Sequence, residues 1–196
     1  MIKEARFYYW GPLLLKIILR NEEIQALKKL CNEAQLKKID HRKHLVGVIK
    51  EELTIDKKKY AAIVEPYLDS YLVSYENWYG RKIKKIETGS VWVNFMKKGE
   101  FNPPHIHPNY DLSSVLYLDI PPGLKKEAQQ FKGKPGGPGA VNFFIAGPQA
   151  FHNNFHTFQP EVGDFFIFPW TLTHFVGPFQ SSGTRTSIAA NFKIKA

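Results

Sequence analysis

Cysteine is almost absent from this chain, because Cys31 is the only one among its 196 residues. An intramolecular disulfide and a cysteine-based metal site are therefore excluded. Cys31 lies in an apolar helical pattern, which predicts a buried thiol without a chemical role. The lack of a disulfide framework and of a recognisable signal peptide predicts a protein of the reducing cytoplasm.

Long apolar runs are also missing. The apolar stretch at residues 11–19 has only nine residues and is interrupted by Lys16. A membrane-spanning helix needs about 20 predominantly apolar residues. We therefore expect no membrane span and no membrane partner.

Acidic residues are scarce relative to basic ones, with 18 Asp and Glu against 27 Lys and Arg and a net charge of +9. Such a surplus attracts acidic partners or anionic substrates. The basic residues are spread over 36–44, 56–60 and 80–87 rather than gathered in one block, which is typical of solvated helix faces and loops. No recognised nucleic-acid-binding motif occurs, so nucleic acid is not the expected partner.

Apolar side chains are abundant: 43% of the residues are hydrophobic and 14% are aromatic. This composition supports a sizeable core and argues against disorder. The length suits one domain over residues 1–196. We expect residues 1–87 to supply a strand at 13–19 and supporting helices, and residues 88–196 to form the core that carries the functional site.

Two segments of the N-terminal part have helical periodicity. Residues 21–35 place apolar side chains at intervals of three and four, with Asn21 as the expected N-cap. Residues 56–80 repeat tyrosine and aliphatic side chains at the same spacing. Pro66 lies inside this second segment and is expected to kink it or divide it.

The residue pattern changes after residue 88, where short runs of β-forming residues alternate with Gly, Pro, Asn and Asp. The runs are residues 89–99, 112–121, 140–147, 164–170 and 185–194. Short strands separated by turn signals predict a β-sandwich or jelly roll. The fold class is therefore mainly β with N-terminal helices, and we expect the helices to pack on the larger sheet.

The segment "NPPHIHPNYD" at residues 102–111 places His105 and His107 two residues apart. In an extended segment these side chains point to the same side, so both imidazoles can reach one metal ion at ~2.1 Å. Asp111 could supply an oxygen ligand if the loop curls back. Taken alone, the pair favours a surface position or a structural histidine over a metal site.

Two later residues have types that suit a cofactor site. His174 lies near the start of a predicted strand, and a jelly roll can bring that position beside His105. Arg185 and Ser187 project from one face of a buried strand, where a guanidinium needs a partner. Together they offer a fork of donors and a hydroxyl, which suits a carboxylate.

Residues 91–121 and 160–192 together resemble the 2-oxoglutarate- and Fe(II)-dependent oxygenases. Within these oxygenases the chain is most similar to a small group found in bacteria and their phages, distantly similar to the prolyl hydroxylases. The resemblance extends over about residues 88–196. It implies a double-stranded β-helix and an oxidoreductase that uses Fe(II), 2-oxoglutarate and O₂. The implied reaction is hydroxylation of a peptidyl residue or small molecule, with release of succinate and CO₂.

The resemblance also implies the metal ligands. His105 and His174 match the two histidines of the family's iron site, and His107 stands where a carboxylate normally lies. Either the site has three histidines, or Asp111 supplies the carboxylate; the sequence leaves both open.

The implied cosubstrate residues lie on three predicted strands. Arg185, with Ser187 and Tyr117, matches the group that binds the distal carboxylate of 2-oxoglutarate. Asn94 and Asn191 face the barrel interior in similar proteins and are expected to help hold this cosubstrate.

Two other interpretations compete with an oxygenase. A cupin-type metal enzyme shares the double-sheet barrel and an opening His-x-His motif, but leaves Arg185 without a role. A non-enzymatic basic β-sandwich would bind nucleic acid or an acidic protein and use its histidines structurally. The prime substrate is not readable from the sequence, and exposed edge strands permit a dimer without requiring one.

The remaining histidines and tryptophans carry less information. His152 and His156 lie in a polar, aromatic segment that we expect to be a surface loop. Trp92 could wall the pocket or fill the core, and filling the core is the preferred interpretation. His41 and His44 lie in the basic segment, and the sequence gives them no role.

Overall fold

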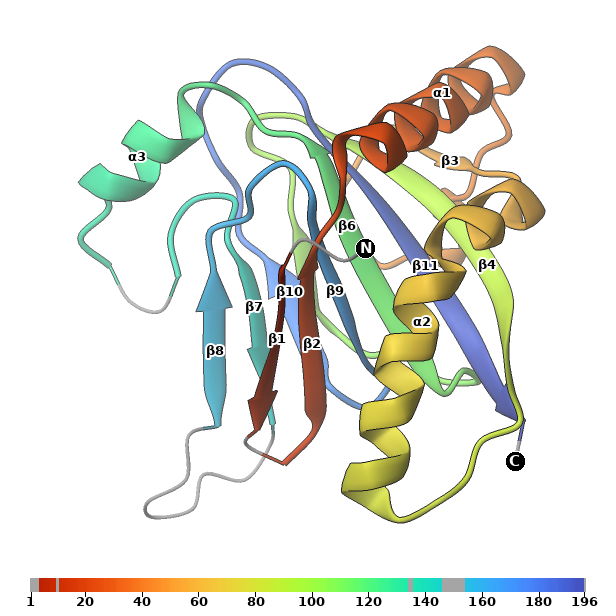
Figure 1. Ribbon diagram of the computed structural model, residues 1–196. Coiled ribbons are helices and arrows are strands. Elements are labelled where there is room, and N and C mark those ends of the chain that lie inside the picture. Colours follow the sequence, from red (N-terminus) through yellow and green to blue (C-terminus); the bar gives the residue numbers. More distant parts are fainter. Residues whose placement is uncertain (1–3, 10, 134–135, 146–153, 196) are drawn as a thin grey trace.

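Two antiparallel sheets form the framework of the molecule. The computed structural model describes residues 4–9, 11–133, 136–145 and 154–195. The larger sheet has the strand order β1-β2-β9-β6-β11-β4-β3, and the smaller sheet has the order β5-β10-β7-β8. In Figure 1 the strands β7, β8 and β10 lie to one side, and the larger sheet continues toward α1 and α2. This is the predicted jelly roll.

The strand bounds follow the chain. The larger sheet contains β1 (Glu4–Tyr9), β2 (Leu13–Ile18), β3 (Glu52–Thr54), β4 (Lys85–Met96), β6 (Leu112–Asp119), β9 (Asp164–Pro169) and β11 (Arg185–Lys195). The smaller sheet contains β5 (Asn102–His105), β7 (Val141–Phe144), β8 (Phe155–Phe158) and β10 (Thr173–Val176). The helices are α1 (Asn21–Lys37), the short 3₁₀ turn η1 (Arg42–His44), α2 (Lys57–Tyr79) and α3 (Leu124–Gln130). The N-terminal part thus contributes three strands to the larger sheet, because β2 pairs with β9 and β3 pairs with β4.

Alternation along the strands divides the core into two layers. In β11, Ile188 and Ala190 belong to the apolar cluster that faces the helices. Arg185 and Ser187 lie on the opposite face and line an internal cavity. Successive side chains of a strand point to opposite faces, so the helix side of the larger sheet is apolar while the side facing the smaller sheet can carry polar groups.

The two long helices cover the outer face of the larger sheet, as expected from the sequence (Figure 1). Tyr60, Val64 and Tyr71 of α2 are fully buried in the apolar cluster beneath them. The Tyr71 hydroxyl donates a hydrogen bond to the carbonyl of Leu13 at 3.0 Å. This bond satisfies a polar group at the buried helix–sheet contact.

Three local predictions were wrong. The N-cap of α1 is Arg20, and the expected N-cap Asn21 is the first helical residue. The Glu23 carboxylate accepts the Arg20 backbone N–H at 3.0 Å, so the helix begins at the position that the N-cap prediction assigns to the cap, one residue earlier than expected. Of the two outcomes expected at Pro66, division of the helix is wrong: α2 is continuous from residue 57 to residue 79, because its buried face packs along the sheet on both sides of the proline. His156 lies in β8 rather than in a loop, and His152 lies outside the described residues.

Removing a side chain from the helix-facing layer is expected to reduce stability without touching the inner face. Leu116 of β6 is fully buried in this layer. Leu116→Ala should lower the free energy of unfolding by about 2–5 kcal/mol, through lost burial and the cavity left behind. Chemical denaturation monitored by circular dichroism would measure the loss. A change below about 1 kcal/mol would mean that the layer repacks freely around the missing side chain.

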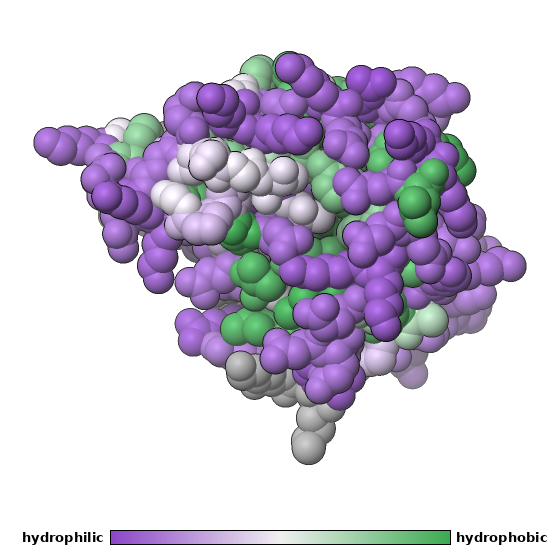
Figure 2. All heavy atoms as spheres, turned by 90° about the horizontal axis from the view of Figure 1, so that it is seen from above, coloured by the Kyte–Doolittle hydropathy of each residue, from purple (hydrophilic) through white to green (hydrophobic). Residues whose placement is uncertain are grey.

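The surface carries mostly hydrophilic side chains. Seen from above, purple residues predominate and the hydrophobic ones lie between them (Figure 2). No helix among the described residues is long and apolar enough to cross a membrane.

Candidate metal centre

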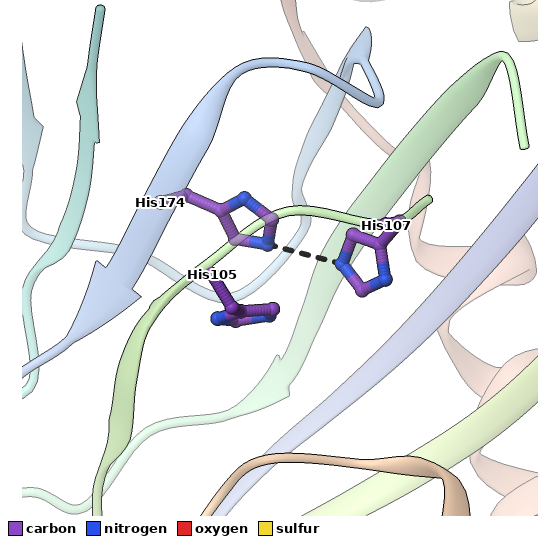
Figure 3. Close-up of side chains that lie close together, drawn as sticks. All are labelled: His105, His107 and His174. Atoms are coloured by element: carbon purple, nitrogen blue, oxygen red, sulfur yellow. Dashed lines mark hydrogen bonds between the residues drawn. The ribbon is translucent and has the colours of Figure 1, made fainter. Parts of the chain in front are cut away.

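Three histidines from two segments converge at one end of the smaller sheet. The antiparallel pairing of β10 with β5 places His174 opposite His105, and His107 follows two residues after His105. One ligand nitrogen from each ring lies within 4.8 Å of the other two. Figure 3 shows the rings turned toward one another, with Nε2 of His107 3.2 Å from Nε2 of His174.

Backbone carbonyls orient two of the rings. Nδ1 of His105 lies 2.7 Å from the carbonyl oxygen of Pro103, and Nδ1 of His174 lies 3.0 Å from that of Leu172. A carbonyl oxygen only accepts hydrogen bonds, so each Nδ1 carries the proton and each Nε2 keeps a free lone pair. This arrangement is typical of histidines that ligate a metal through Nε2.

Burial keeps the three rings neutral. Desolvation lowers the pKa of His107 to about 3, with a smaller contribution from the nearby His105. Desolvation also lowers the pKa values of His105 and His174. Neutral imidazoles are the form that binds metal ions, so the cluster is ready for a cation at neutral pH.

The spacing of the His107 and His174 rings fits a shared metal ion. Two nitrogens bound at ~2.1 Å to one ion lie roughly 3.0 Å apart at a right angle and roughly 3.4 Å apart in a tetrahedron. The observed 3.2 Å between the Nε2 atoms of His107 and His174 lies within this range. The donor set of three imidazoles suits iron and other first-row transition metals.

Asp111, the alternative third ligand, is engaged elsewhere. Its carboxylate accepts the backbone N–H of Ile194 at 2.8 Å, and its own N–H donates to the carbonyl of Phe192. Asp111 thus anchors the start of β6 to β11 and is not part of the histidine cluster.

A cavity of about 90 Å³ opens beside the histidines, between the two sheets. Strand pairing places Tyr117 of β6 opposite Ser187 of β11, and Ser187 opposite Asn94 of β4. Directly paired residues point to the same face, so these three side chains form a polar row on the inner face of the larger sheet. All three line the cavity together with Arg185.

Arg185 is a buried cation without an acidic partner. Only 2% of its surface is exposed, and no ion pair to it occurs among the described residues. One guanidinium nitrogen donates to the carbonyl of Gly139 at 3.0 Å. Within the described ranges, Nε and the nearby Tyr117 hydroxyl have no hydrogen-bond partner. The guanidinium carbon lies 5.2 Å from the centre of the Tyr117 ring. Buried donors left unpaired are costly, so this end of the cavity is suited to an anion such as a carboxylate.

The comparison with known families agrees with this arrangement. A family model described as "Putative 2OG-Fe(II) oxygenase" matches residues 90–191, where 2OG stands for 2-oxoglutarate. The chain belongs to this oxygenase family. It is therefore an oxidoreductase, and its family implies Fe(II) and 2-oxoglutarate.

Solved structures show the same fold for this oxygenase. A prolyl-4-hydroxylase from Pseudomonas putida is 14% identical, with a TM-score of 0.60 over 96% of this chain and 91% of that one. A viral collagen prolyl hydroxylase from Paramecium bursaria Chlorella virus-1 is 17% identical, with a TM-score of 0.58 over 93% and 96%. The carbocyclase SnoK from nogalamycin biosynthesis is 10% identical, with a TM-score of 0.63 over 95% and 80%. None of the curated proteins compared with the chain matches it.

The two asparagines of the oxygenase have different surroundings. Asn94 accepts the Trp92 indole N–H at 3.1 Å and lies 3.4 Å from the Ser187 hydroxyl, at the cavity wall. Asn191 accepts the Ser113 hydroxyl at 2.8 Å and is not among the residues that line the cavity.

Sequence reasoning missed one side of the cavity. Residues 44–46 and Glu52 line it, although the basic segment gave no sign of a site. His41 stacks on Trp92 with ring centroids 5.2 Å apart and an interplanar angle of 10°. Trp92 is buried, as expected, but it also borders the cavity. The three-residue strand β3 is too short for periodicity to reveal which of its side chains point inward.

Proposed function

We propose that the protein is an Fe(II)- and 2-oxoglutarate-dependent dioxygenase whose iron is held by His105, His107 and His174. The buried Arg185 binds the distal carboxylate of 2-oxoglutarate, assisted by Tyr117. The observation that carries the proposal is a buried guanidinium without an acidic partner in the described part of the molecule, on the same small cavity as three converging imidazoles. When bound, Fe(II) and 2-oxoglutarate supply O₂ activation and substrate oxidation, with release of succinate and CO₂.

The protein's own groups hold and orient the reactants. His105, His107 and His174 would hold the metal ion, which would supply coordination sites for the keto acid and O₂. The carbonyls of Pro103 and Leu172 fix two of the rings, which limits their rotation. The cavity walls combine polar groups with apolar side chains, among them Val115, Val141 and Phe168.

Arg185 selects a dianionic keto acid and sets its direction. A charge-assisted hydrogen bond contributes about 1.5–3 kcal/mol. Because Nε of Arg185 and the Tyr117 hydroxyl lack partners, a carboxylate at this position would restore hydrogen bonds to both residues. Ser187, opposite both Tyr117 and Asn94, offers a further hydroxyl on the same row.

The competing interpretations fit the molecule less well. In a cupin-type enzyme that uses no keto acid, the buried, charged Arg185 would have no ligand to bind. A purely structural role for the histidines does not account for three neutral rings turned toward one point. The prime substrate is a small molecule or a protein residue, and hydroxylation is the outcome that we propose. Relatives of this fold include prolyl hydroxylases and a carbocyclase, so the fold alone does not set the outcome.

An anaerobic titration tests the proposal directly. Adding Fe(II) and then 2-oxoglutarate to the protein should produce a weak absorption band in the green region, from chelation of the metal by the keto acid. Succinate, which lacks the 2-oxo group, is the matched control and should give no band. A protein that binds 2-oxoglutarate equally well with and without metal, and shows no band, would contradict the proposal.

A further inference from the structure

Glu52 is a buried carboxyl on the cavity wall to which the proposed reaction gives no role. Only 1% of its surface is exposed. Neither carboxylate oxygen has a hydrogen-bond partner within the described part of the chain. The side chain lines the same cavity as the three histidines and Arg185. An unpaired carboxyl in this setting is costly, which indicates a place for a ligand.

Strand register fixes the direction of Glu52. Glu52 of β3 pairs with Asn94 of β4, and Asn94 points to the inner face. The neighbouring Leu53 belongs to the helix-facing layer, which confirms that Glu52 points inward. The polar row on the inner face therefore runs from Tyr117 through Ser187 and Asn94 to Glu52. Strands lie ~4.8 Å apart, so Glu52 lies roughly 10 Å across the sheet from Ser187.

Glu52 borders the histidine cluster without belonging to it. Trp92, one row away on β4, has its ring centroid 6.0 Å from that of His107. The group of potential metal ligands contains the three histidines and no carboxylate. No ion pair of Glu52 occurs among the described residues, and the nearby Arg42 is paired with Asp40 at 2.6 Å.

The charges at the two ends of the cavity are opposite. Arg185 attracts an anion at the β11 end, and the Glu52 carboxylate repels one at the β3 end. A group that settles beside Glu52 must donate hydrogen bonds, and a positive charge compensates the buried carboxylate best. Val46 lines the same cavity as Glu52 and is 57% exposed, so the cavity wall at this residue reaches the solvent.

We propose that Glu52 is a specificity-determining residue that binds a cationic nitrogen group of the prime substrate, guanidinium or ammonium, on the β3 side of the histidines. The part of this inference that concerns a prime substrate rests on the proposed function. The binding of a cation by Glu52 is a property of the cavity that can be measured without turnover.

Guanidinium and urea form a matched pair of probes, because they have nearly the same shape and differ in charge. Each is titrated at millimolar, non-denaturing concentrations and pH 8 into protein loaded with Zn(II), as a diamagnetic substitute, and 2-oxoglutarate. The signal is the Trp92 indole N–H in nuclear magnetic resonance spectra, assigned with Trp92→Phe. We expect guanidinium to bind at least ~10-fold more tightly than urea, as a charge-assisted bond predicts.

The variants separate Glu52 from general charge effects. Glu52→Gln should remove the preference for guanidinium. Glu51→Gln, the same change one residue before β3 at a side chain that pairs with Lys97 and does not line the cavity, should keep it. Equal binding of both probes by the unchanged protein would overturn the inference. A preference that persists in Glu52→Gln would also overturn it.

The pH dependence has a defined sign. Burial raises the pKa of Glu52 to about 7, so the carboxyl takes up a proton as the pH falls through this value and loses the charge that attracts guanidinium. Guanidinium affinity should therefore fall between pH 8 and pH 6, and remain flat in Glu52→Gln. Other titratable or charged groups lie near Glu52 or on the same cavity: Asp40, His41, Arg42, His44, Glu100, His105, His107, His174 and Arg185. The variant that lacks only the Glu52 charge distinguishes its titration from theirs.

The Fe(II)–2-oxoglutarate absorption band, recorded on the same proteins, separates the two proposals. Selectivity for guanidinium without the band would remove the oxygenase mechanism and leave the cation site standing. The band without selectivity would remove the role of Glu52 and leave the oxygenase mechanism standing.

Discussion

Replacing His174 by alanine is expected to abolish tight metal binding and, with it, succinate release. His174 is the buried member of the cluster, and it faces both His105 and His107 across the point where their nitrogens converge. Without it, only two imidazoles, both from one short segment, would remain to hold the metal ion. Loss of a partner that merely orients a ligand reduces metal affinity by about 10–100-fold, so removal of the ligand itself should exceed about 100-fold.

Metal titration by calorimetry measures this loss, and circular dichroism verifies that the variant is folded. His156→Ala is the matched control, because His156 is also on the smaller sheet, in β8, and lies outside the cluster. This control should bind metal as the unchanged protein does. Unaltered metal affinity in His174→Ala would mean that the three rings do not share an ion.

Local sequence patterns predicted the two parts of this site, whereas their meeting was expected from the jelly roll and from the family resemblance. Spacing alone put His105 and His107 on one side of an extended segment. Bringing His174 to them depends on the pairing of β5 with β10, two four-residue strands almost 70 positions apart in the chain. No local pattern encodes such a long-range register. The expected jelly roll made the meeting of the two segments possible, and the family resemblance made it specific.

The β-rich core was readable because its strands alternate. Residues 185–190 place Arg185 and Ser187 on one face and apolar side chains on the other, and the structure has this division. No sequence pattern indicated Glu52 as a cavity residue, because β3 has only three residues and follows a basic segment. Its inward direction is decided by its partner Asn94, which is 42 positions later in the chain. The polar row can therefore be recognised only once the pairing of the four strands β6, β11, β4 and β3 is known.

Replacing Arg185 by glutamine is expected to weaken 2-oxoglutarate binding by about 10–100-fold while leaving metal affinity unchanged. The estimate follows from the loss of one charge-assisted pair, at about 1.5–3 kcal/mol. Glutamine keeps a donor for the carbonyl of Gly139, which limits the structural disturbance. Calorimetric titration of the metal-loaded variant with 2-oxoglutarate measures the change.

Pyruvate separates an effect on the distal carboxylate from a general loss of the site. It chelates a metal through its 2-oxo and carboxylate groups but has no second carboxylate, so Arg185→Gln should not alter its affinity. An equal loss for both keto acids would mean that the substitution distorts the cavity. An unchanged affinity for 2-oxoglutarate would place its distal carboxylate away from Arg185. Since Nε of Arg185 and the Tyr117 hydroxyl would then stay buried without partners, a different anion would have to account for them.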